Sequence, residues 1–262
     1  MDSVCCEPLS LLELKSLSIF LKIAFPSSSE LLMINHEKLE LVVNAYCDHF
    51  DSWWEHEEHK LRALKQFKEH WDLGCEDFVA MYQLSTQYAD QLLIADKGFP
   101  GGMIVCFAKM AEHTTKQAFF ELLDESKDLA SRIDAFTNTI RILLNQFAVD
   151  NPNWALNIKQ SQSISSYLYF AYPERYYVYQ KELVAKFASF LDCPLKLADS
   201  LKGSDLVSIF EFFDQVKDYI QNHHELLNKG QALFDSHGLK ISALNLIAWD
   251  LSCFYARSYD QQ

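Results

Sequence analysis

Apolar residues recur at steps of three and four along most of the chain, a spacing typical of amphipathic α-helices. The clearest run covers residues 126–147, where steps of four and three alternate. Asn35 stands before a second run and Ser204 at the start of a third, and either side chain can cap a first helical turn. The pattern predicts helices at about 10–24, 36–50, 53–71, 76–93, 126–147, 161–171, 181–191, 204–220, 224–234 and 242–254, with short helices between 103 and 123.

Two segments rich in turn-forming residues interrupt this pattern. Residues 96–103 (DKGFPGGM) hold three of the seven glycines, and residues 150–154 (DNPNW) follow the longest amphipathic run. We take the second break as a boundary, and expect a helical N-terminal subdomain over residues 1–150 and a helical C-terminal subdomain over 151–262.

Strand composition is strong in one place only, residues 176–179 (YYVY). The chain has only 7 glycines and 6 prolines, fewer turn residues than a sandwich or barrel of short strands requires. We therefore predict a mainly α, multi-helical fold in which residues 176–179 are the one candidate for a short β segment.

The formal net charge is −13, and no basic block or tail stands out. A non-specific DNA binder usually presents a basic stripe, because its affinity comes largely from neutralising phosphates. Any DNA contact would need a local patch or a second subunit. The apolar stretch at residues 9–25 contains Glu13, Lys15 and Lys22 and lacks the features of a signal peptide, and no run reaches the ~20 apolar residues of a membrane span. We expect a cytoplasmic protein without a membrane partner.

We expect no catalytic, metal or cofactor site in this sequence. His56 and His59 are three residues apart, whereas a zincin motif needs four. No Lys-Ser or Lys-Thr follows Gly101 and Gly102 as a phosphate-binding loop requires. The seven cysteines form no C-x-x-C pair. Acidic residues that share helix faces are expected to be solvated: Glu121, Asp124, Glu125 and Asp128.

One segment is unusually rich in tyrosine. Residues 167–179 (YLYFAYPERYYVY) contain six tyrosines around one proline and one arginine. Aromatic rings beside cations are what single-strand and flipped-base binders use, and tyrosine is also common at protein interfaces. The alternative interpretation, which we favour over recognition, is a helix–turn–strand unit whose rings pack into the core. The candidate DNA or partner contacts are Tyr172, Arg175, Tyr176, Tyr177, Tyr179 and Lys181.

This segment also carries a resemblance. Residues 164–168 (ISSYL) and 172–179 (YPERYYVY) resemble a pattern that precedes the motor domain in McrB-like restriction ATPases/GTPases. Residues 92–104, residues 120–136 and the Trp-Asp-Leu of residues 249–251 are similar to further motifs of that group, in the same order, so that the resemblance covers about residues 50–256. Ala171 and Gln180 depart from it, since the group commonly has Arg and Lys there.

The resemblance implies a role in defence against foreign DNA. In such systems an N-terminal part selects the target, an AAA+ motor domain or subunit hydrolyses nucleotide, and a nuclease subunit cuts. The chain lacks Walker motifs, so we expect it to be a non-catalytic recognition module that contacts modified or foreign DNA. The alternative is an adaptor that binds a phage protein or a partner subunit without touching DNA. A helical enzyme that uses the acidic faces is a third hypothesis.

Overall fold

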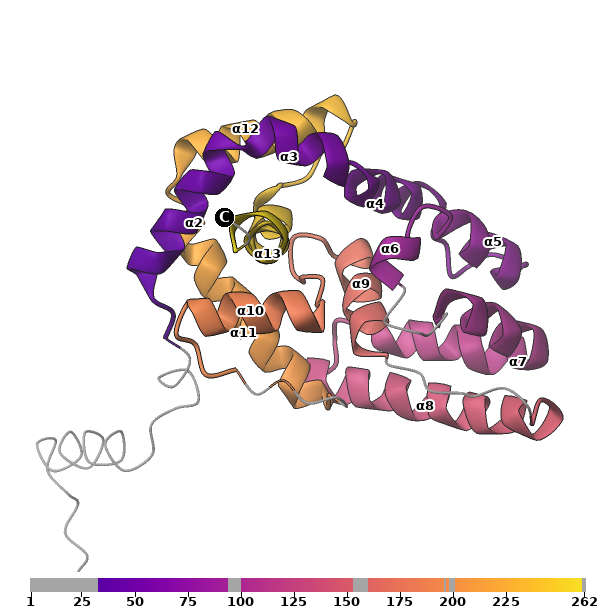
Figure 1. The fold of residues 1–262 in the computed structure, drawn as a ribbon. Helices are drawn as coiled ribbons and strands as arrows, with labels where there is room; N and C mark the ends of the chain where they lie inside the picture. The colour runs from indigo at the N-terminus through magenta and orange to yellow at the C-terminus, as the bar shows by residue number, and fades with distance from the viewer. Residues whose placement is uncertain (1–32, 94–99, 153–159, 196, 198–200, 261–262) are drawn as a thin grey trace, which may run out of the picture. The chain divides into compact units, whose positions relative to one another are not determined.

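The computed structural model describes residues 33–93, 100–152, 160–195, 197 and 201–260. Contacts divide the chain into residues 1–33 and a compact unit, Ile34–Gln262, and only the second is described below. The helix predicted at 10–24 and residues 96–99 of the 96–103 segment lie outside the described residues. Within them, twelve α-helices and no strand are found, which confirms the mainly α, multi-helical fold (Figure 1). Residues 176–179 are extended but pair with no strand in this part of the chain.

The first three described helices are α2 (His36–Asp48), α3 (Phe50–Glu57) and α4 (His59–His70). The Asn35 side chain accepts a hydrogen bond from the backbone N–H of Lys38 at 3.1 Å, so the predicted cap is confirmed. The helix predicted at 53–71 is instead two helices that meet at Glu58. Trp53 of α3 and Lys60 of α4 both donate to Asp250, further along the chain.

The next helices pack as a layer around large rings. They are α5 (Phe78–Ser85), α6 (Asp90–Leu93), α7 (Pro100–Leu122) and α8 (Leu129–Asp150). Helix α7 is kinked at Ala111, and α8 begins where the Asp128 side chain accepts a hydrogen bond from the backbone N–H of Ser131. Helices α7 and α8 lie side by side (Figure 1), and α5 packs on α7.

Five α-helices and a π-helical turn follow in the C-terminal part of the described chain. They are α9 (Ser161–Ala171), α10 (Lys181–Phe190), α11 (Gly203–Ile220), α12 (His224–Ser236), α13 (Leu244–Phe254) and the π-helical turn η2 (Tyr255–Tyr259). Helix α11 begins at Gly203, so Ser204 is not its cap, and the Asp205 carboxylate accepts from the N–H of Lys202 instead.

Helices α9 and α13 are buried along almost their whole length, which explains their apolar composition. Helix α13 packs against α2, α10, α11 and α12, while α9 packs against α4, α6 and α7. Helices from both sides of residue 150 therefore share contacts, such as α8 with α11, and the division into subdomains at 150/151 stays a prediction. None of the described helices combines the length and apolar character needed to cross a membrane.

Candidate functional site

The tyrosine-rich segment starts at the C-terminal end of α9. The N–H of Tyr172 donates to the Leu168 carbonyl and ends the helix, and the N–H groups of Arg175 and Tyr176 then donate to the Tyr172 carbonyl. Pro173 cannot donate a backbone hydrogen bond, so a turn replaces the next helical turn here. After the turn the chain runs extended to α10.

Three of the six predicted contact residues are buried. The side chains of Tyr176, Tyr177 and Tyr179 are 6%, 0% and 3% exposed. Tyr177 donates its hydroxyl hydrogen to Asp214 at 2.6 Å, and burial raises the pKa of Tyr177 far above its usual value. Rings in these positions fill the core, so they present no face on which a base could stack.

Tyr172, Arg175 and Lys181 lie nearer the surface. The Tyr172 hydroxyl donates to the Leu123 carbonyl at 2.7 Å, which fixes its ring against the end of α7. The Arg175 side chain is 62% exposed, and its Nη1 lies 2.5 Å from Oε2 of Glu125. Lys181 opens α10 and is partly exposed. The one arginine of the segment is therefore already paired with a carboxylate.

Glu125 is the shared partner of three side chains in this region. Its Oε1 also accepts from the buried Arg132 guanidinium at 2.7 Å and from the Tyr176 hydroxyl at 2.7 Å. Arg132 donates in addition to the Leu122 carbonyl and to Tyr176. Glu125 is thus not part of a solvated acidic face, as the sequence suggested, but an ion-pair partner for two arginines. Arg132 on the apolar side of α8 was the available signal, because a buried cation requires an anion nearby.

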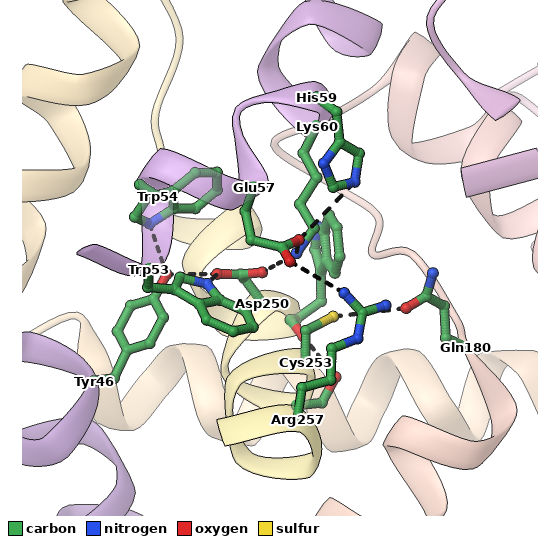
Figure 2. Close-up of polar contacts among 12 residues, drawn as sticks. Tyr46, Trp53, Trp54, Glu57, His59, Lys60, Gln180, Asp250, Cys253 and Arg257 are labelled. Carbon is green, nitrogen blue, oxygen red and sulfur yellow. Dashed lines mark hydrogen bonds and ion pairs between the residues drawn. The ribbon is translucent and has the colours of Figure 1, made fainter. Parts of the chain in front are cut away.

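A second cluster of charges is buried where α13 meets α3 and α4 (Figure 2). Asp250 is fully buried and accepts from Lys60 on one oxygen and from the Tyr46 hydroxyl (2.6 Å) and the Trp53 indole (2.8 Å) on the other. Lys60 also lies 2.6 Å from Glu57, which in turn pairs with Arg257 at 3.1 Å. Two cations and two carboxylates thus balance in formal charge.

The chemistry of Lys60 follows from these partners. Burial alone would lower the pKa of Lys60, but the neighbouring negative groups, led by Asp250, outweigh it and raise the pKa above its usual value. An amine nucleophile needs a lowered pKa, so Lys60 in this state is a structural cation. Its ammonium also lies over the Trp249 ring, 4.8 Å from the centroid. This cation–π contact stabilises the packing of two helices that are far apart in sequence.

Cys253 and His59 lie beside this cluster (Figure 2). Burial raises the pKa of Cys253 to about 11, so that its thiol stays protonated near neutral pH. Burial also lowers the pKa of His59, which lies 3.9 Å from Glu57. Across the part of the chain that the structure describes, no group of three His, Cys, Asp or Glu side chains is placed to hold a metal ion.

An open groove of about 650 Å³ lies beside Tyr172. Its lining comes from the end of α4, the end of α7 with the turn that follows, and the end of α9. Aromatic side chains include Trp71, Phe120 and Tyr172, and charged side chains include Lys68, Asp72 and Glu121. Sequence reasoning missed this groove, because its walls join three segments that are distant in sequence.

Comparisons with known proteins add no identification. No protein-family model, no curated protein and no solved structure matches the chain.

Proposed function

We propose that the chain is a non-catalytic recognition adaptor that binds a protein partner, and that it serves in an McrB-like restriction system. The resemblance of residues 50–256 supports the second half of this proposal. The partner would then be a phage protein, the AAA+ motor or the nuclease subunit.

One observation carries the choice of a protein over DNA. In the segment predicted to meet DNA, three tyrosine rings are buried and Arg175 is paired with Glu125. A phosphate would have to compete with that carboxylate, in a chain whose net charge is −13. DNA affinity depends mainly on cations that neutralise phosphates, so this surface favours a protein partner.

Direct DNA reading remains the second candidate, favoured by the resemblance and by the exposed guanidinium of Arg175. The two are separated by titrating the purified chain into labelled DNA, as duplex and single strands, plain and base-modified, at low and physiological salt. We expect no saturable binding. Saturable binding of one DNA, weakened steeply by salt and lost on Arg175→Ala, would overturn the proposal.

A further inference from the structure

The groove beside Tyr172 has an aromatic rim on a rigid base. Phe120 is 46% exposed, one of the few large apolar side chains on the described surface. Trp71 stacks on the buried Phe67, with ring centroids 4.5 Å apart and an interplanar angle of 17°. Phe67 in turn stacks on the buried Phe170. The partly exposed Trp71 ring is thus held on a packed base, and a ring held in this way suits an interface anchor because little side-chain freedom is lost on binding. The exposed Phe120 adds apolar surface to the same groove.

The helix ends around the groove give it a negative character. Helices α4, α7 and α9 all reach it with their C-terminal ends, through Trp71, Leu123 and Tyr172. A helix C-terminus carries a partial negative charge from its outward carbonyl groups. The last turn of α4 carries Lys68 and His70, and the Leu122 carbonyl at the end of α7 accepts from Arg132, so these two ends are partly offset. Helix α9 has no basic side chain in its last turn, so its end keeps the partial negative charge.

The charged side chains of the lining add to this bias. Lys127 lies 3.5 Å from Asp124, so these two largely offset each other. Of the others, Asp72 and Glu121 are anions and Lys68 is a cation, and none of the three forms an ion pair with a described residue. Glu121 accepts a hydrogen bond from Gln117 at 3.2 Å, and Asp72 accepts one from the N–H of Gly74 at 2.7 Å.

We infer that this groove docks a partner segment in which an aromatic or long aliphatic anchor is flanked by lysine or arginine. The inference rests on the proposed function and adds the location and the chemistry of the partner. The anchor packs on Phe120 and Trp71, while the basic side chain meets Glu121 and Asp72 near the aromatic faces. The excess negative charge of the whole chain favours the approach of such a segment.

The test is a selection of random peptides displayed on phage against the full chain, followed by titration of synthetic copies of the selected peptides. We expect sequences enriched in Trp, Phe or Leu beside Lys or Arg. Phe120→Ala should weaken their binding about tenfold, as loss of an interface anchor does. Tyr88→Ala, at an aromatic side chain of similar exposure (48%) on another face, should leave binding unchanged.

A charge reversal tests the second half of the inference. Glu121→Lys should weaken binding of the basic peptides several-fold, whereas Glu112→Lys, exposed on the same helix and outside the groove, should not. Circular dichroism of each variant shows whether the fold is kept. Peptides that bind all four variants equally would overturn the groove assignment and leave the adaptor proposal standing. If DNA binds and no peptide does, both the groove assignment and the adaptor proposal are wrong.

Discussion

Arg175 and Glu125 form an ion pair of 2.5 Å, and the same carboxylate binds the buried Arg132. The two arginines differ in exposure, since the Arg132 side chain is 3% exposed and that of Arg175 is 62% exposed. The buried Arg132 therefore depends on Glu125 as its anion, whereas the exposed Arg175 could be solvated by water instead.

This difference predicts unequal effects of mutation. Arg132→Ala should reduce the free energy of unfolding by about 2–4 kcal/mol, because it removes a buried ion pair and the hydrogen bonds that Arg132 donates to the Leu122 carbonyl and the Tyr176 hydroxyl. Arg175→Ala should cost less than about 1 kcal/mol, as exposed ion pairs do. Urea denaturation of both variants measures this. Equal losses would mean that Arg175 is as structural as Arg132.

Helix positions were largely predictable, because apolar spacing directly reflects which side of a helix is buried. Helices α9 and α10 agree closely with the predicted ranges. Interruptions were harder, since neither the break at Glu58 nor the kink at Ala111 is marked by a Gly or Pro in the sequence.

The site was predictable only in part. The tyrosine-rich segment was found from composition, but composition does not tell a buried tyrosine from an exposed one. The pairing of Lys60 with Asp250 joins residues 190 positions apart, and no local sequence pattern predicts such a pair. The same holds for the groove, which joins the ends of three helices.

The buried ion pair of Lys60 gives a second prediction. Lys60→Met should cost about 3–5 kcal/mol of unfolding free energy, because it leaves the carboxylates of Asp250 and Glu57 buried with too few partners. Lys65→Met on the same helix, where the lysine is exposed and 3.9 Å from Glu69, should cost less than about 0.5 kcal/mol.

A double-mutant cycle isolates the pair itself. Adding Asp250→Asn to Lys60→Met should cost less than the sum of the two single changes, since the second change removes the charge that the first left unpaired. Strict additivity would show that the two groups do not interact energetically.

Alkaline pH should unfold the protein cooperatively. Burial raises the pKa of several tyrosines in the folded state, among them the deeply buried Tyr46, Tyr82, Tyr167, Tyr169 and Tyr177. A raised folded-state pKa means that this stability is complete below the unfolded value of about 10 and is lost as pH rises above it. Each such tyrosine adds a slope of about −1.4 kcal/mol per pH unit.

Absorbance of ionised tyrosine and far-ultraviolet circular dichroism, followed together from pH 8 upward, check this prediction. We expect both signals to change in one transition, and Tyr177→Phe to reduce the slope by about one proton. Gradual tyrosine ionisation with intact helices would contradict it.

Gly203 gives a prediction about helix packing. A Cβ atom there would lie 2.1 Å from the Ala130 carbonyl oxygen, so Gly203→Ala must push α11 away from α8 and should cost more than about 2 kcal/mol. At Gly101 the nearest atom to an added Cβ is the Tyr82 hydroxyl at 3.7 Å, an ordinary contact. Gly101→Ala should leave the melting temperature unchanged or raise it, because alanine favours the helix.

The most direct measurement compares the two kinds of partner with one preparation of the full chain. A selected basic–aromatic peptide and a labelled DNA are each titrated at low and at physiological salt. Saturable peptide binding, only modestly weakened by salt, with no saturable DNA binding is the result that a protein-binding adaptor predicts. Saturable DNA binding that falls steeply with salt and disappears in Arg175→Ala, with no peptide binding, would contradict it.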